Sequence, residues 1–140
     1  MTRLMTPVEY IAAWNANVKQ HFDDGDYEWI CDRIRQIPSE KPINKILEIG
    51  CGSGYSTLLF LLSDFDVVSI DANVVAIDAA KQLIEEHDYD PRSDVKLLNL
   101  DVVHDYKAVK EESRKNSCDI ILFCNPGGTN LFDKARRELA

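Results

Sequence analysis

The sequence predicts an α/β fold of the doubly wound class, with a parallel sheet of about four strands behind an N-terminal helical segment. Three observations lead to this prediction. From residue 43 onward, short apolar runs alternate with longer helical runs. The first apolar run ends in a glycine-rich turn, "ILEIGCGSG" (46–54), and the second ends in an acid, Asp71. Alternation of this kind indicates parallel strands joined by helical crossovers.

The start of the chain is predicted to be helical. Thr6 can cap a helix, Pro7 suits its first turn, and Glu9 completes a capping box. A second helix is expected over residues 27–37, followed by the turn-rich linker "PSEKP". These elements make up the N-terminal helices, residues 1–42.

The rest of the chain, residues 43–140, is predicted to form the sheet and its covering helices, and residues 1–140 are interpreted as a single domain. Strands are expected in the runs "NKILEIG" (44–50), "DVVSID" (66–71), "DVKLLNLDV" (94–102) and "CDIILFCNPGG" (118–128). Helices are expected in the runs "YSTLLFLLSDF" (55–65), "NVVAIDAAKQLIEEHDY" (73–89), "YKAVKEESRKN" (106–116) and "NLFDKARRELA" (130–140).

Composition restricts the classes of function. The formal net charge of −8 disfavours binding to nucleic acid, whose partners usually carry a basic face. No apolar run is long enough for a membrane span, and the first residues lack a secretory signal, so we expect a cytoplasmic protein with no membrane partner. The cysteines lack metal-ligand or redox spacing, which predicts free thiols and no metal site: Cys31, Cys51, Cys118 and Cys124.

The glycine-rich turn predicts a ligand site at the carboxyl end of the first strand. Gly50, Gly52 and Gly54 remove side chains there, and the helix that follows presents backbone N–H groups to a ligand. Asp71 ends the next strand 21 residues after Gly50, where a carboxylate can accept hydrogen bonds from ribose hydroxyls. Together they predict a nucleoside ligand. The alternatives are a tight turn without ligand and an aspartate that only caps the next helix.

The spacing of the glycines bears on which nucleoside is bound. Dinucleotide sites favour G-x-G-x-x-G, whereas this turn reads G-x-G-x-G with Tyr55 at the position of the last glycine. An aromatic side chain there would crowd a pyrophosphate. The pattern is more compatible with a ligand that has a sulfonium and a short amino-acid tail in its middle.

At this point the sequence resembles the class I S-adenosylmethionine-dependent methyltransferases, which have a Rossmann-like fold. The matching segments, in family order, are "ILEIGCGSGYST", "VSIDAN", "LLNLDV" and "CDIILFCNPGG". They span about residues 43–130 and cover the cofactor-binding part of the family fold. The resemblance implies the strand order third, second, first, fourth. It also implies S-adenosylmethionine as cofactor and S-adenosylhomocysteine as product.

The resemblance assigns roles residue by residue. Glu48 would face the methionine amino group, the turn from Gly50 through Cys51 and Gly52 to Gly54 would line the methionine portion, and Asp71 would hold the ribose. The N–H groups that begin the next helix would come from Tyr55 and Ser56. Ala72 and Asn73 would flank the adenine, Asp101 would accept a hydrogen bond from its amino group, and Val102 would stack beside the ring. For Asp101 the alternative is a turn or capping residue.

The acceptor side of the resemblance is less complete. In families that methylate amino nitrogens, the fourth strand ends in Asn or Asp, then Pro-Pro and an aromatic residue. Here the stretch is "NPGG", so Asn125 would sit near the transferring methyl group as the predicted catalytic residue, or would only form a turn before Pro126. The missing aromatic disfavours a nucleobase acceptor.

Four aromatic residues of the N-terminal helices would close over the cofactor as a lid: Tyr10, Trp14, Tyr27 and Trp29. For the two tryptophans the alternative is that they anchor the core.

The fourth strand is almost wholly apolar and would lie at the edge of the sheet, where unpaired N–H groups promote aggregation. Three explanations are open: the chain is C-terminally incomplete, another copy or a partner chain covers the edge, or the domain is a small variant. We expect a homo-oligomer or a partner chain at this strand.

The predicted function is methyl transfer from S-adenosylmethionine to a small-molecule or protein acceptor. The alternatives are a non-catalytic nucleoside-binding module and an NAD-dependent oxidoreductase.

Overall fold

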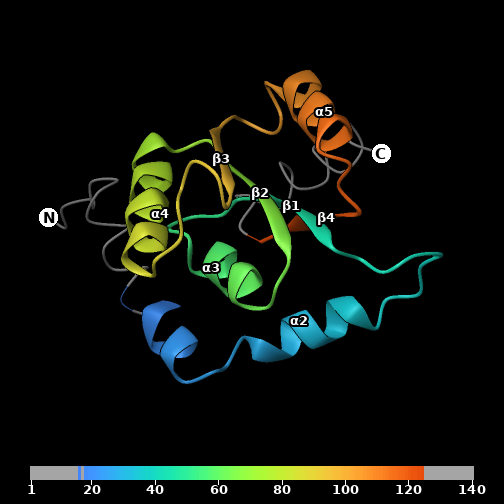
Figure 1. The fold of residues 1–140 in the computed structure, drawn as a ribbon. Coiled ribbons are helices and arrows are strands. Elements are labelled where there is room, and N and C mark those ends of the chain that lie inside the picture. The colour runs from blue at the N-terminus through green and yellow to red at the C-terminus, as the bar shows by residue number, and fades with distance from the viewer. Residues whose placement is uncertain (1–15, 17, 125–140) are drawn as a thin grey trace, which may run out of the picture.

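A parallel four-stranded sheet organises the part of the chain that the computed structural model describes, residue 16 and residues 18–124 (Figure 1). Its strands are β1 (Lys45–Ile49), β2 (Asp66–Asp71), β3 (Lys96–Asn99) and β4 (Ile120–Phe123). They lie in the order β3-β2-β1-β4, which confirms the predicted doubly wound fold and the strand order that the resemblance implied.

Helices cover both faces of this sheet (Figure 1). They are α2 (Glu28–Arg35), α3 (Tyr55–Leu62), α4 (Val74–Glu86) and α5 (Tyr106–Lys115). Ile46 and Val67 pack into one core cluster with residues of α2, α3 and α4. Their chain neighbours Leu47 and Val68 belong to a second cluster with Val109 of α5. Since successive strand residues point to opposite faces, the two clusters are the two sides of a doubly wound sheet.

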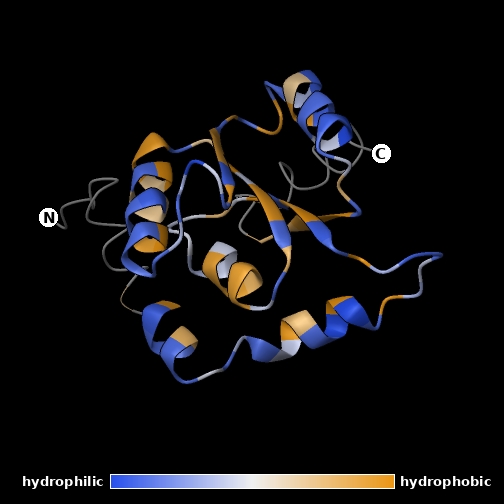
Figure 2. Cartoon of the chain, viewed as in Figure 1, coloured by the Kyte–Doolittle hydropathy of each residue, from blue (hydrophilic) through white to orange (hydrophobic). Residues whose placement is uncertain are grey.

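The sequence pattern explains which helices are buried. α3 is almost wholly apolar and buries five consecutive residues, from Thr57 to Leu61, against the sheet and its neighbours. α5 is polar and buries only Val109, as predicted for a partly exposed cover. Figure 2 shows this contrast in hydropathy between α3 and α5. None of the helices in the described part has both the length and the apolar character needed to cross a membrane.

The fourth strand departs from its prediction in burial. The apolar run suggested burial on both faces, but each residue of β4 is only half-buried. β4 pairs with β1 and, within the described residues, has no second neighbouring strand, so less of it is covered. The remainder of its predicted run beyond residue 124 and the predicted helix 130–140 lie outside the described residues, as does most of the predicted first helix.

Candidate functional site

The glycine-rich turn is held at the carboxyl end of the sheet by the neighbouring strand. The N–H groups of Gly50 and Cys51 donate to the carbonyl oxygen of Ile70, at 2.8 and 3.1 Å. Three glycines of the turn have positive φ, at 83° for Gly50, 54° for Gly52 and 98° for Gly54. Non-glycine residues adopt such angles at a cost, so the backbone path itself requires glycine.

Two of these glycines face different surroundings. A Cβ built on Gly54 would lie 2.8 Å from both Cα and Cβ of Ala80, so this glycine lets α3 begin in contact with α4. A Cβ built on Gly52 would meet nothing within 4 Å. The open side of the turn is therefore at Gly52, where a ligand can lie against the main chain.

Asp71 turns its carboxylate toward this turn. Its Oδ2 accepts from the N–H of Gly52 at 2.9 Å, and its Oδ1 accepts from the N–H of Asn73 at 2.8 Å. The helix cap that Asp71 offered as an alternative is supplied by Asn73, whose Oδ1 accepts from the N–H of Val75 at 2.9 Å. Each Asp71 oxygen keeps a further lone pair, so the carboxylate can accept from two more donors.

The residues predicted around an adenine lie at the ends of two neighbouring strands. Asp71 pairs in register with Asn99, and Asp101 follows two residues later. Asp101 Oδ1 accepts from the N–H groups of Val103 and His104, at 2.8 and 3.0 Å. These bonds, chiefly the one from His104, lower the pKa of Asp101. Asp101 thus forms the turn that the sequence offered as an alternative, and its contact with an adenine stays a prediction.

Glu48 is fully buried beneath the turn. Its Oε1 accepts from the hydroxyl groups of Thr57, at 2.5 Å, and Ser69, at 2.9 Å. Its Oε2 has no partner at hydrogen-bonding geometry among the described residues, although the Cys124 thiol interacts with this carboxylate. Burying a polar atom without a partner costs free energy, so this oxygen marks a place where a donor from a ligand or water fits.

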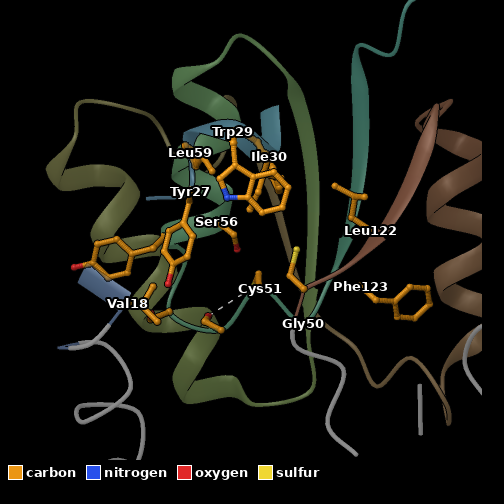
Figure 3. A pocket seen from close by; sticks show the side chains of 15 residues that line it. Val18, Tyr27, Trp29, Ile30, Gly50, Cys51, Ser56, Leu59, Leu122 and Phe123 are labelled. Atoms are coloured by element: carbon orange, nitrogen blue, oxygen red, sulfur yellow. Dashed lines mark hydrogen bonds between the residues drawn. The ribbon is translucent and has the colours of Figure 1, made fainter. Parts of the chain in front are cut away.

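A cavity of about 410 Å³ opens beside the turn (Figure 3). The turn and the start of α3 form one wall, and apolar side chains of α2, α3 and β4 form the others: Tyr27, Trp29, Ile30, Leu59, Phe60, Leu122 and Phe123. Figure 3 shows Trp29 and Ile30 on one side of this space and Leu122 on the other. Its volume falls in the range of small-molecule sites.

The pKa values of the two thiols in the cavity wall are raised, which favours their protonated forms. Burial, and then the nearby charges of Glu48 and Asp71, raise the pKa of the Cys51 thiol well above its usual value. Desolvation of the sulfur, followed by the charge of Glu48, raises the pKa of Cys124 in the same way, although Cys124 as a whole residue is exposed. Neither group is a candidate nucleophile, since the thiolate is the reactive form.

The structure brings together only part of the predicted site. Gly50, Cys51, Gly52, Tyr55 and Ser56 line the cavity. The residues predicted for the adenine end lie outside its lining: Asp71, Ala72, Asn73, Asp101 and Val102. Asn125, Tyr10 and Trp14 lie outside the described residues.

The aromatic residues of α2 and its approach resolve one alternative. Trp29 is 63% exposed, so its interpretation as a core anchor is wrong, because its side chain lines the cavity instead of packing under the sheet. Tyr55, at the start of α3, packs against Phe22 with ring centroids 5.5 Å apart, and burial raises its pKa. Sequence reasoning missed Ile30 and Leu122 as cavity residues, because an apolar residue in a helix or strand gives no sign of which gap it borders.

Among the residues that the structure describes, no group of three His, Cys, Asp or Glu side chains is placed to hold a metal ion. All four cysteines are free. The described part of the site offers backbone amides, the carboxylate of Asp71 and an apolar wall.

Comparison with known proteins places this geometry in context. A family model described as protein-L-isoaspartate(D-aspartate) O-methyltransferase matches residues 33–110. No curated protein matches the chain.

Several solved structures share the fold. A protein from Methanococcus maripaludis, described as an S-adenosyl-L-methionine-dependent methyltransferase, has a TM-score of 0.65 at 17% identity. The match covers 99% of this chain and 61% of that one. A protein from Staphylococcus aureus, assigned as a caffeoyl-CoA O-methyltransferase, has a TM-score of 0.58 at 19% identity, covering 93% and 66%. The plantazolicin methyltransferase BpumL, solved in complex with SAH, has a TM-score of 0.50 at 19% identity, covering 89% and 47%. The chain thus spans about two thirds or less of these neighbours.

Proposed function

Since this chain belongs to the protein-L-isoaspartate(D-aspartate) O-methyltransferase family, within the class I methyltransferases that its sequence resembles, we propose that it binds S-adenosylmethionine and transfers the methyl group to an acceptor. The observation that carries the proposal is the Asp71 carboxylate, 2.9 Å from the Gly52 N–H at the open side of the turn. A ribose beside the turn would donate its two hydroxyl groups to this carboxylate.

The residues present fit the cofactor in two further respects. Gly52 leaves open space where the thioether and amino-acid tail would lie against the main chain. The unpartnered Oε2 of Glu48 gives the site a buried acceptor for the methionine ammonium, directly or through water. The complex of BpumL with SAH supports the same choice of ligand.

The bound cofactor would supply a methyl group that is already electrophilic, because it is attached to a sulfonium. The chain's own residues then have to orient the donor, exclude water and admit the acceptor. Gly52, Asp71 and Glu48 would orient the donor, and the apolar wall would exclude water. Asn125 stays a prediction for the residue near the methyl group.

For the acceptor we propose a small molecule or a protein side chain. The net charge of −8 argues against a nucleic acid. Because the chain spans only part of its structural neighbours, a module that binds the cofactor without transferring the methyl group is the second candidate. Four free thiols support a reducing, cytoplasmic location.

Calorimetry with S-adenosylmethionine, S-adenosylhomocysteine and NAD tests the cofactor. We expect both adenosyl ligands to bind and NAD to bind far more weakly. Asp71→Asn should weaken S-adenosylhomocysteine binding at least about tenfold, because hydrogen bonds to a charged acceptor contribute about 1.5–3 kcal/mol each. The matched control is Asp66→Asn, an exposed aspartate at the opposite end of the same strand.

Thermal unfolding without ligand checks that Asp71→Asn is folded, since Asp71 also accepts from Gly52 and Asn73. Equal affinity of a folded Asp71→Asn variant and the wild type would contradict the proposal, as would preferential binding of NAD. An assay of S-adenosylhomocysteine release with cell extract then separates an enzyme from a binding module.

A further inference from the structure

Three polar side chains meet in the core beneath the glycine-rich turn. Glu48 of β1 and Ser69 of β2 lie opposite each other in the register of the two strands. Thr57 comes from α3, which packs on the same face of the sheet. All three residues are 0% exposed. A polar cluster thus continues the row in which Ile46 and Val67, two residues earlier in each strand, belong to the apolar core.

The contacts within this cluster direct both hydroxyl groups at one carboxylate oxygen. Thr57 Oγ1 donates to Glu48 Oε1 at 2.5 Å, and Ser69 Oγ donates to the same atom at 2.9 Å. The two hydroxyl oxygens lie 2.9 Å apart, so each limits the rotation of the other. A carboxylate oxygen has about two acceptor positions, and these two donors fill those of Oε1. The remaining acceptor capacity of Glu48 is therefore on Oε2.

The Glu48 carboxylate lies next to the wall of the cavity. The Cys124 thiol, which interacts with this carboxylate, is part of the cavity lining. A thiol is only a weak donor, and Oε2 has no partner at hydrogen-bonding geometry among the described residues. Buried polar atoms are rarely left in this state. An ammonium group that enters from the cavity would supply the donor, directly or through water.

We propose that Thr57 and Ser69 are positioning residues for the cofactor. Their hydroxyl groups hold the Glu48 side chain in one conformation and keep Oε2 available for the ammonium group of S-adenosylmethionine. This inference rests on the proposed function and adds two residues to its site. Both residues are fully buried and lie outside the cavity lining, so they act through Glu48.

Holding the carboxylate in place before the ligand arrives lowers the cost of binding. A glutamate side chain has several rotatable bonds, and ordering it on binding costs conformational free energy. Here two hydroxyl groups from different elements order it in the folded chain without a ligand. The benefit is selective, because only a ligand with a donor for Oε2 uses the ordered carboxylate. An adenosyl thioether without the ammonium group gains nothing from it.

Calorimetry on the full chain with two ligands isolates this contact. One ligand is S-adenosylhomocysteine, and the other is the same molecule with hydrogen in place of the ammonium group. We expect the wild type to bind the first at least about tenfold more tightly, because the second lacks the hydrogen bond to a charged acceptor. Thr57→Val and Ser69→Ala should each reduce this ratio of affinities at least about threefold. The affinity for the ligand without the ammonium group should change less than about twofold, since that ligand makes no use of Oε2.

Three further variants are controls. Thr57→Ser keeps the hydroxyl group and should restore the ratio of affinities. Glu48→Gln removes the charge that attracts the ammonium group and should give the lowest ratio. Ser63→Ala removes a hydroxyl group at the other end of α3, outside the cavity lining, and should leave both affinities unchanged.

Thermal unfolding without ligand checks that each variant is folded. Ser69→Ala removes one oxygen and adds no atom in its place, so it keeps the test available if Thr57→Val does not fold. Equal weakening of both ligands in the folded variants would overturn the inference, because the hydroxyl groups would then support only the fold. An unchanged ratio of affinities would overturn it as well.

Two outcomes separate this inference from the proposed function. If the wild type binds both ligands equally well, the ammonium group does not use Glu48, and the inference fails while the proposed cofactor stands. If S-adenosylhomocysteine itself does not bind, the proposed function fails first.

Discussion

Two glycines of one turn are glycine for different reasons. Gly54 has a φ of 98° and lies against Ala80, so a side chain there collides with the backbone of α4. Gly52 has a φ of 54° and open space above it. The first glycine therefore serves the packing of α3 on α4, and the second serves the approach of a ligand.

Substitution by alanine separates these two roles. Gly54→Ala should lower the free energy of unfolding by about 2–5 kcal/mol, as the sum of a left-handed backbone with a Cβ and an overpacked contact. Gly52→Ala should lower it by only about 1–2 kcal/mol, because only the cost of the left-handed backbone applies. The same Gly52→Ala variant should weaken S-adenosylhomocysteine binding at least about tenfold, since its methyl group occupies the ligand's side of the turn.

Urea denaturation without ligand gives the stabilities, and calorimetry gives the affinities. The two variants are matched controls for each other, since they place the same methyl group two residues apart. A Gly52→Ala variant that binds S-adenosylhomocysteine as tightly as the wild type would show that the ligand does not lie against this turn.

At the residue scale, local pattern predicted some roles and not others. The direction of Asp71 followed from its place at the end of a strand next to the turn. The contact between Gly54 and Ala80 was not predictable, because it joins residues of two helices whose relative position only the folded chain fixes. Asp101 illustrates a third case, since an acid that ends a strand suits both a ligand and a turn.

Among the elements, β1 and β4 are joined by one side chain in addition to their parallel backbone pairing. Asp119 precedes β4, and its Oδ2 accepts from the N–H groups of Asn44 and Lys45, at 2.9 and 3.0 Å. The N–H of Asp119 donates to the carbonyl oxygen of Lys45 at 2.8 Å. These bonds join the amino ends of two strands that are more than seventy residues apart in the chain.

This link should depend on pH. The hydrogen bonds, chiefly the one from Asn44, lower the pKa of Asp119 below its usual value. Folding therefore favours the deprotonated carboxylate. The stability that it contributes is present above the unfolded pKa of about 3.9 and is lost as the pH falls through the folded pKa.

Asp119→Asn should therefore lower Tm at about pH 7, and the difference from the wild type should shrink toward about pH 3. Thermal unfolding followed by circular dichroism over this range measures both. Asp78→Asn, at an exposed aspartate of α4, is the control and should leave Tm unchanged. A difference that stays constant with pH would mean that the charge of Asp119 does not contribute.

The elements themselves were largely predictable from the sequence. β2 has the predicted bounds, because an apolar run flanked by turn residues leaves little freedom in where the strand begins and ends. α3 ends at Leu62, three residues before the predicted end. The reason is local: Asp64 adopts a φ of 66°, which stops the helix although the following Phe65 still packs into the core. Burial of β4 was overestimated, since composition alone does not tell a central strand from one with fewer neighbours.

For the whole molecule, the arrangement of strands explains why the site lies where it does. Parallel strands end at one edge of the sheet. The turn after β1, Asp71 at the end of β2 and Cys124 after β4 therefore come together although the sequence separates them. The N–H of Cys124 donates to the carbonyl oxygen of Ile49 at 2.9 Å, which places the end of β4 directly beside the turn. The glycine pattern predicted the cofactor side of this edge. The apolar wall of the cavity depends on how α2 packs across this edge, which no short pattern encodes.

The same arrangement predicts self-association. β4 has the sequence Ile-Ile-Leu-Phe, each residue is half-buried, and within the described part only β1 lies beside it. Half-buried apolar surface along a sheet margin favours contact with another chain. We therefore expect a homo-oligomer whose interface includes β4.

Light scattering coupled to size-exclusion chromatography, over the widest range of concentration that solubility allows, should give at least twice the mass of one chain. Hydrogen exchange should then slow for the amide of Ile121 as the concentration rises, while the amides of the central strand β2 stay unchanged as an internal control. A mass of one chain at every concentration would contradict the prediction, because the margin of the sheet would then be stable without a second copy.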